Sequence, residues 1–100
     1  MPRPLRPQIA GATYHLTCRG NRRSVIYRDE GDHAFFLSIL LVVLSRYGWK
    51  CDAWCQMATH YHLLVMTPEP NIASGMQYLN SRYAEGFNHR YGLTGHLFGG

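Results

Sequence analysis

The stretch Met57-Ala58-Thr59-His60-Tyr61-His62-Leu63-Leu64-Val65-Met66 places two histidines one residue apart in an apolar run. Side chains alternate across a β-strand, so His60 and His62 share one face, about 6–7 Å apart along the backbone. Tyr61 and its apolar neighbours take the other face and pack beneath the sheet. A buried histidine is more often a hydrogen-bonded core residue, but two imidazoles held on one rigid face are also able to share a metal ion.

Arginine dominates the charge of this chain. The 100 residues are the size of one domain, and ten Lys and Arg against six Asp and Glu give a formal charge of +4. Five arginines lie in the first quarter: Arg3, Arg6, Arg19, Arg22 and Arg23. Because a planar guanidinium suits phosphate, the clusters predict a polyanionic partner, with a solubilising surface charge as the alternative.

The cysteines and the hydropathy pattern predict a cytoplasmic protein. Cys18, Cys51 and Cys55 are odd in number, and no apolar signal sequence precedes them, which favours reduced thiols. The longest apolar run, from Phe35 to Leu44, is about half the length needed to cross a bilayer. We therefore expect no membrane partner.

The N-terminal third predicts an arm, a strand and a basic turn. Three prolines within the first seven residues favour an extended arm over residues 1–10, followed by a single domain over residues 11–100. Period-two alternation over residues 12–18 predicts a strand with Tyr14, Leu16 and Cys18 on one side. Residues 19–23, Arg-Gly-Asn-Arg-Arg, follow as a turn.

Two helices are predicted from apolar spacing. The first begins at Asp29 or Asp32 and ends at Tyr47, and its many apolar residues predict that it lies deep in the core. The second is capped by Asn71 and ends at Tyr91. Spacings of three and four define the stripes Phe36, Ile39, Leu40, Val43 and Tyr47, with Leu37, Leu41 and Leu44 added, and Ile72, Met76, Leu79, Tyr83 and Phe87.

The order of elements predicts an α+β fold. Residues 49–59 and 60–67 read as two strands, although no strong turn dipeptide decides whether they form a tight hairpin. Strand, helix, strand, strand and helix give the ferredoxin-like β-α-β-β-α-β order, with the last strand absent or incomplete after Gly95. Both helices then cover one face of an open antiparallel sheet. The other face, with the histidine pair, is the predicted working surface.

Several blocks of this sequence occur together: Tyr14-His-Leu-Thr-Cys-Arg-Gly-Asn-Arg-Arg23, Met57-Ala-Thr-His-Tyr-His-Leu-Leu-Val65, Leu79-Asn-Ser-Arg-Tyr-Ala84, Phe87-Asn-His-Arg90 and Gly95-His-Leu-Phe98. These blocks closely resemble the REP-associated tyrosine transposases of the HUH single-strand nuclease superfamily. The resemblance runs from about Gly11 to Phe98 in the expected order. One departure is Thr59, where the family commonly has Asn.

The resemblance implies metal-assisted cleavage and rejoining of single-stranded or hairpin DNA through a phosphotyrosine link, as in transposition. It implies that His60 and His62 hold a divalent ion, Mg²⁺ or Mn²⁺, which polarises the scissile phosphate. It also implies DNA contacts for Arg19, Asn21, Arg22 and Arg23. Relatives of this kind dimerise, so a homodimer is a further expectation.

The nucleophile is the missing part of that expectation. In the family, the catalytic tyrosine and a third metal ligand sit on a further helix, which here falls beyond Gly100, so the chain resembles a C-terminally truncated member. Tyr83 and Tyr78 are the candidates on the second helix. Tyr83 lies on the apolar stripe and is only a fallback, so no catalytic tyrosine is assigned, and whether this chain alone is an enzyme stays open.

Two other interpretations compete with that of a transposase domain. The first is a non-catalytic ferredoxin-like nucleic-acid-binding module that stacks bases on sheet aromatics. Its candidate residues are Tyr14, Tyr61, Trp49 and Trp54. The second is a structural zinc site built from Cys51, Cys55 and the two histidines, although the two cysteines lie about 13 Å apart if they share one strand. His15 is noted because its strand is expected to neighbour that of His62.

Overall fold

The computed structural model describes residues 8–99. In this range, three antiparallel strands form one sheet in the order β1-β3-β2. The strands are β1 (Ala12–Arg19), β2 (Lys50–Met57) and β3 (His60–Thr67), and the helices are α1 (Glu30–Tyr47) and α2 (Ile72–Tyr91), with a short 3₁₀ turn η1 (Asn21–Arg23). The predicted order of elements and the α+β class are confirmed.

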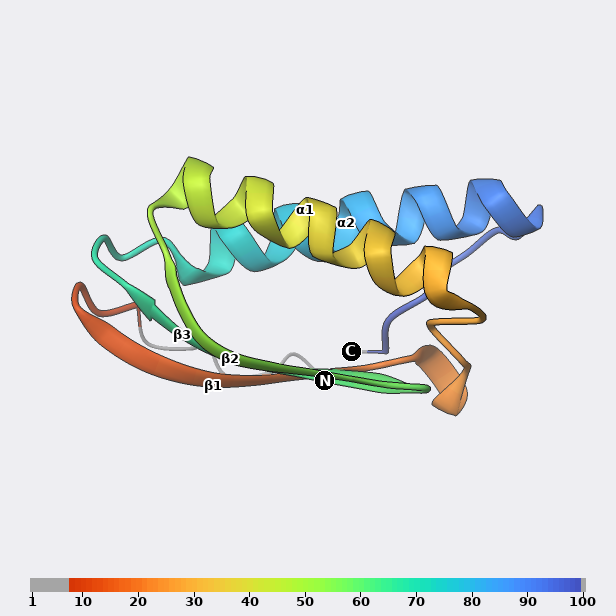
Figure 1. The fold of residues 1–100 in the computed structure, drawn as a ribbon, viewed down its shortest axis with the longest axis horizontal. Coiled ribbons are helices and arrows are strands. Elements are labelled where there is room, and N and C mark those ends of the chain that lie inside the picture. The colour runs from red at the N-terminus through yellow and green to blue at the C-terminus, as the bar shows by residue number, and fades with distance from the viewer. Residues whose placement is uncertain (1–7, 100) are drawn as a thin grey trace.

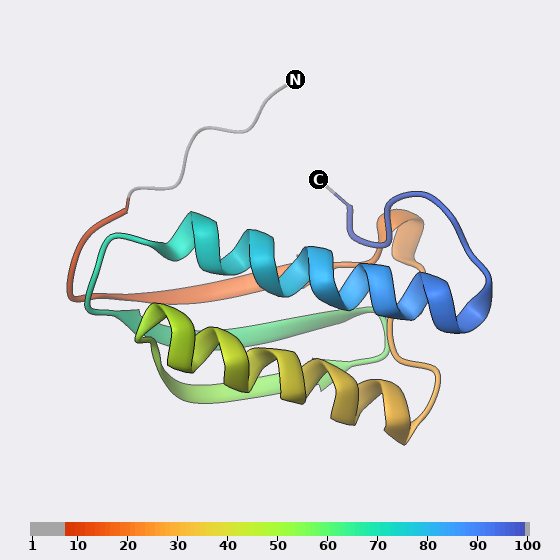
Figure 2. The same cartoon turned by 90° about the horizontal axis from the view of Figure 1, so that it is seen from above.

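The molecule has two layers, with both helices on one side of the sheet (Figure 1). The helices run antiparallel, with α2 over the β1 side of the sheet and α1 over the β2 side (Figure 2). The far face of the sheet carries no helix in the described part of the chain. This arrangement matches the open sheet predicted from the order of elements.

The covered face of β3 forms the centre of the core. Tyr61, Leu63 and Val65 are at most 1% exposed, as the alternation of the strand predicts. The Tyr61 ring lies 4.7 Å from that of Phe36 on α1, and its hydroxyl donates to Asn80 on α2. Burying each such side chain contributes about 1.5–3 kcal/mol, so this face holds the helices on the sheet.

The helix boundaries follow from their end residues. The Asp29 side chain accepts a hydrogen bond from the Asp32 amide and caps α1, while Gly48, with φ of 71°, ends it in the left-handed region. Asn71 stands at the predicted N-cap of α2, but its side chain caps nothing. Instead it accepts from the Trp49 indole and donates to the Tyr47 carbonyl, so it ties the start of α2 to the end of α1.

The prediction that α1 lies deep in the core is wrong for its outer side. Phe36, Leu40 and Val43 are buried, but Leu41 is 67% exposed and Val42 47%. The sheet and α2 cover only two sides of α1, and no other element of residues 8–99 covers its outer side. Helix α1 is therefore apolar on every side but buried only on the sides that face the sheet and α2.

The segment after α2 returns to the end of β1 (Figure 1). Phe98 forms a single antiparallel bridge with Gly20, and the Gly99 amide donates to the Arg19 carbonyl. A complete fourth strand is not present among residues 8–99. The arm predicted for residues 1–10 lies mostly outside the described residues.

Candidate metal and nucleic-acid site on the open sheet face

His60 and His62 lie side by side on the open face of β3, as predicted. Their ring centroids are 5.0 Å apart, with the ring planes nearly perpendicular at 83°. Arg19 and Thr17 of β1 stand opposite them in the sheet register. Since β3 is the central strand and is anchored by its covered face, the backbone under both histidines is held on two sides.

Each histidine has one ring nitrogen occupied and one left over. The Nδ1 atom of His62 is 3.0 Å from the Thr17 hydroxyl, and that of His60 is 3.3 Å from the Thr59 hydroxyl. Neither Nε2 atom has a hydrogen-bond partner in the described part of the chain. A metal-binding histidine commonly uses one nitrogen for the metal and bonds the other to a neighbour that orients the ring. Thr59, the departure from the family pattern, fills that orienting place.

His15 joins this cluster from β1. Its Nε2 atom lies 3.2 Å from Nδ1 of His62, and the two rings stack with centroids 5.3 Å apart. Partial desolvation, then His60, His15 and Arg19, lower the pKa of His62. A lowered pKa keeps the imidazole neutral at neutral pH, which is the form that ligates a metal.

The donor set fits part of a coordination sphere. Among residues 8–99, no group of three or more His, Cys, Asp or Glu side chains is placed to hold a metal ion. Two imidazoles with open positions beside them suit an ion that also takes water or phosphate oxygens. A metal ion held by the histidine pair alone would therefore keep open coordination positions, unlike an ion in a closed structural site.

The structure does not form the alternative zinc site. A register shift between Cys51 and Ala53 lets Cys51 pair with Val65 on the covered side, while Cys55 pairs with His62 on the open side. Paired residues in a sheet point to the same face, so the two cysteines lie on opposite faces. Burial raises the pKa of the Cys51 thiol, which disfavours the thiolate that zinc needs.

The basic turn lies at the same end of the sheet as His60. The Gly20 amide donates to the Thr59 carbonyl, and the Ile26 amide to the Ala58 carbonyl, so residues 20–26 are fastened to the two-residue turn between β2 and β3. Arg22 and Arg23 have φ of 55° and 58°. Such left-handed angles cost energy in non-glycine residues and are found often at functional sites.

All four predicted DNA-contact residues are exposed at this end: Arg19, Asn21, Arg22 and Arg23. Arg19 lies on the open face directly across from His60. The structure thus brings the predicted metal residues and the predicted DNA residues together. The sequence pattern predicts that the strand of His15 lies beside that of His62, but it carries no signal for the contact between the two side chains.

The seven tyrosines all lie away from the histidine pair. Tyr14 and Tyr61 point to the covered face, Tyr27 is buried in the loop before α1, and the others are on the helices. Tyr83, the fallback nucleophile, is completely buried, and its hydroxyl donates to the Ile26 carbonyl. Burial raises its pKa far above the ordinary value, so the hydroxyl is neither exposed nor easily ionised.

The aromatic platform of the binding-module reading is also absent from the open face. Tyr61 and Trp49 are at most 4% exposed, and Tyr14 pairs with Val65 on the covered side. Trp54 is 56% exposed but pairs with the buried Leu63, so it belongs to the covered side as well. Base stacking on the open face does not have these residues available.

Fold and site define an α+β domain whose open antiparallel sheet carries a histidine pair beside a basic turn. None of the helices in residues 8–99 is long and apolar enough to cross a membrane. The family described as "Transposase IS200 like" matches residues 8–99. The chain belongs to this transposase family.

Two solved structures share the fold. A REP-associated tyrosine transposase bound to a REP hairpin is similar with a TM-score of 0.77 and 22% identity, over 99% of this chain and 58% of that one. A candidate transposase from Deinococcus radiodurans R1 is similar with a TM-score of 0.66 and 22% identity, over 90% of this chain and 69% of that one. The present chain thus spans little more than half of the first structure. No curated protein sequence matches the present chain.

Proposed function

We propose that this domain binds single-stranded or hairpin DNA together with a divalent ion, Mg²⁺ or Mn²⁺, and serves DNA strand cleavage and rejoining in transposition. One observation carries the proposal: a histidine pair with two free Nε2 atoms and an exposed basic turn meet at one end of the sheet in a transposase-family domain. The similar structure that holds a REP hairpin supports DNA as the partner.

In this proposal His60 and His62 would hold the ion through their Nε2 atoms. A bound divalent ion polarises a phosphate oxygen and stabilises the charge that develops there. Thr17 and Thr59 keep the rings oriented. Arg19, Arg22 and Arg23 neutralise the DNA backbone beside them, which positions the strand without reading its sequence.

The tyrosine for a phosphotyrosine link comes, in this proposal, from outside residues 8–99. No described tyrosine approaches the histidines, and Tyr83 is fixed in the core by its bond to Ile26. We expect the 100-residue chain alone to form no protein-linked DNA band on a denaturing gel with Mn²⁺ and a labelled hairpin. A band that disappears in Tyr83→Phe or Tyr78→Phe would contradict this assignment.

Metal binding is tested by titrating Mn²⁺ into the chain and into His60→Ala and His62→Ala. Each variant is expected to lose at least tenfold in Mn²⁺ affinity, the order of loss for a weakened metal site. His89→Ala, an exposed histidine in the last turn of α2, is the matched control and should bind like the parent. Equal Mn²⁺ binding in all four proteins would refute the histidine site.

DNA binding is tested with a fluorescent hairpin oligonucleotide at several salt concentrations, with and without EDTA. Arg22→Ala is expected to weaken binding of every sequence and to reduce the salt slope by about one. Arg46 lies in the last turn of α1, and Arg46→Ala should leave both the affinity and the salt slope unchanged. If neither EDTA nor the histidine substitutions change DNA binding, the result favours the non-catalytic nucleic-acid-binding module instead.

A further inference from the structure

His15 belongs to the histidine cluster on the open face, but the proposed function gives it no role. It lies on β1 and pairs with Leu64, two residues along the strand from Thr17, which pairs with His62. Residues diagonal to one another across two antiparallel strands are within reach of long side chains. The His15 ring therefore reaches the Nδ1 side of His62 and not its free Nε2 atom.

The two rings approach each other through their nitrogens. Nε2 of His15 lies 3.2 Å from Nδ1 of His62, which is hydrogen-bond distance. The ring planes differ by 24° and the centroids are 5.3 Å apart, so the rings are offset and these two nitrogens face one another. A hydrogen bond between two neutral imidazoles needs one nitrogen with a proton and one with a free lone pair. The contact therefore links the place of the ring proton in His62 to its place in His15.

Thr17 also contacts Nδ1 of His62, but it does not decide where the proton of that ring lies. Its hydroxyl is 3.0 Å from the nitrogen. A hydroxyl both donates and accepts, so it fits His62 with or without a proton on Nδ1. An imidazole nitrogen is much more basic than a hydroxyl oxygen, which makes His15 the better acceptor for an N–H group at this position.

A metal ion on Nε2 of His62 requires one particular arrangement of these protons. A neutral imidazole carries a single ring proton, which must then be on Nδ1. Nε2 of His15 is placed to accept this N–H group, and because the His15 side chain is exposed, its own ring proton can stay on Nδ1. Loss of the acceptor behind a metal-binding histidine commonly weakens metal binding by about 10–100-fold.

We propose that His15 is a positioning residue of the metal site: its Nε2 atom accepts the Nδ1–H group of His62 and so leaves Nε2 of His62 free for the divalent ion. The inference rests on the proposed function, because it concerns the ion that His60 and His62 would hold. In this assignment His15 acts through His62 and does not touch the ion. Its role differs from that of Thr17, which orients the ring in either arrangement.

The test measures Mn²⁺ affinity of the full chain by electron paramagnetic resonance, which detects the free ion. His15→Phe keeps a flat ring without the acceptor and should bind Mn²⁺ at least about tenfold more weakly than the parent. His15→Gln is the rescue and should bind like the parent, because its amide oxygen reaches about as far as Nε2 does. His15→Asn is one methylene shorter and should bind as weakly as His15→Phe. His89→Phe, at an exposed histidine in the last turn of α2, is the control and should bind like the parent.

A combined variant separates positioning from direct metal binding. In the His62→Ala background, His15→Phe should cause no further loss of Mn²⁺ affinity, because the residue through which His15 acts is gone. A further loss there of about tenfold would make His15 a ligand and overturn the proposal. Thermal melts of the His15 variants should match that of the parent, since the side chain is exposed. A lower melting temperature in the weakly binding variants would make the role structural and would also overturn it.

The remaining outcomes separate this inference from the proposed function. Weak Mn²⁺ binding by His15→Gln, or parental binding by His15→Phe, overturns the role of His15. If His60→Ala and His62→Ala still lose Mn²⁺ affinity in either case, the proposed function stands. No Mn²⁺ binding by the parent at all overturns the proposed function, and the role of His15 with it.

Discussion

The two faces of β3 differ in what their side chains do. On the covered face Tyr61, Leu63 and Val65 are at most 1% exposed, and Tyr61 contacts both helices, whereas the open face presents His60, His62 and an exposed Leu64. One strand therefore carries the centre of the core on one side and the candidate chemistry on the other. Because the side chains alternate, stability and function are separable residue by residue along the same eight positions.

The strongest way to break this comparison is Tyr61→Ala. Deleting a fully buried aromatic side chain leaves a cavity between the sheet, Phe36 and Asn80, so we expect a loss of about 3–5 kcal/mol in the free energy of unfolding. Urea denaturation measures it. Leu64→Ala, three positions along on the open face, is the control and should cost under about 1 kcal/mol. Similar losses for both variants would show that the open face is covered in solution.

Gly75→Ala probes the covered side within α2. Alanine favours a helix over glycine by about 0.5–1 kcal/mol. However, a Cβ atom at Gly75 would stand 2.1 Å from the buried Trp49 ring. Overpacking of this kind costs about 1–3 kcal/mol, so we expect a net loss of about 1–2 kcal/mol in unfolding free energy. A more stable variant by chemical denaturation would mean that Trp49 moves aside without cost.

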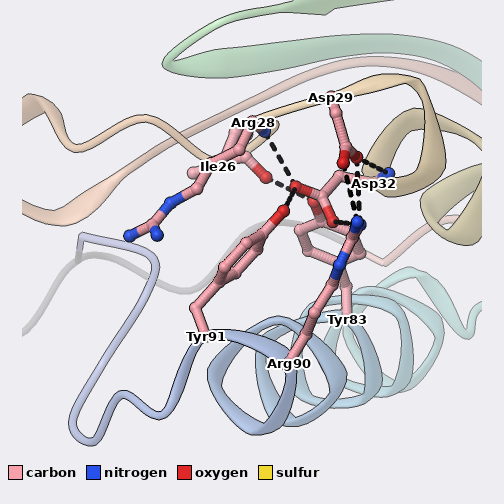
Figure 3. Close-up of polar contacts among 7 residues, drawn as sticks. All are labelled: Ile26, Arg28, Asp29, Asp32, Tyr83, Arg90 and Tyr91. Carbon is pink, nitrogen blue, oxygen red and sulfur yellow. Dashed lines mark hydrogen bonds and ion pairs between the residues drawn. The ribbon is translucent and has the colours of Figure 1, made fainter.

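Arg90→Gln sharpens the comparison through pH. Arg90 bonds Asp29 and the buried Asp32, joining the end of α2 to the start of α1 (Figure 3). Its hydrogen bonds, with that from the Asp32 amide, lower the pKa of Asp29 below the ordinary 3.8. The ionised Asp29 carboxylate therefore contributes to the stability of the fold above pH 3.8, its ordinary pKa. This contribution is lost as the pH falls through the lower pKa of the folded state.

We expect Arg90→Gln to lower the melting temperature at pH 7. We also expect the melting temperature of this variant to fall less than that of the parent as the pH drops below 5. Thermal melts across that range measure both. Arg82→Gln, on the same helix and without an ion pair among residues 8–99, should keep the parental profile. A parallel acid response in Arg90→Gln and the parent would show that Arg90 does not hold the Asp29 carboxylate.

The smallest expected effect on stability is that of His62→Gln. The side chain lies on the open face, and its contacts are with exposed His15 and Thr17. We expect the melting temperature to stay within about 2 °C of the parent, although Mn²⁺ affinity falls. A large drop in melting temperature without metal would place the histidine in a structural role and remove the separation between the two faces.

Much of this arrangement was predictable from local pattern. Alternation put Tyr14, Leu16 and Cys18 on the covered face and the two histidines on the open one. Helical spacing gave the buried faces of both helices to within a few residues. These features depend on near neighbours in the sequence, and the period of the side chains decides them.

Other features depend on contacts between distant segments and left no such signal. The register shift at Asp52 turns Cys51 to the covered face, and no residue type announces it. Leu41 and Val42 look as apolar as Leu40, yet only their place relative to the sheet and α2 decides exposure. The Asn21 amide bonds the Leu97 carbonyl because residues 97–99 return to the basic turn, and no periodicity predicts that contact.

The bridge between Gly20 and Phe98 has a consequence for the order of folding. Contacts between residues far apart in the sequence close a long loop and form slowly, whereas the β2–β3 hairpin and the helices rely on nearby residues. The basic turn is synthesised early, but the hydrogen bond from its Asn21 amide to the Leu97 carbonyl cannot form until Leu97 has been added. The basic turn therefore reaches its final shape only when residues 97–99 are in place, after the sequences of all the helices and strands have been made.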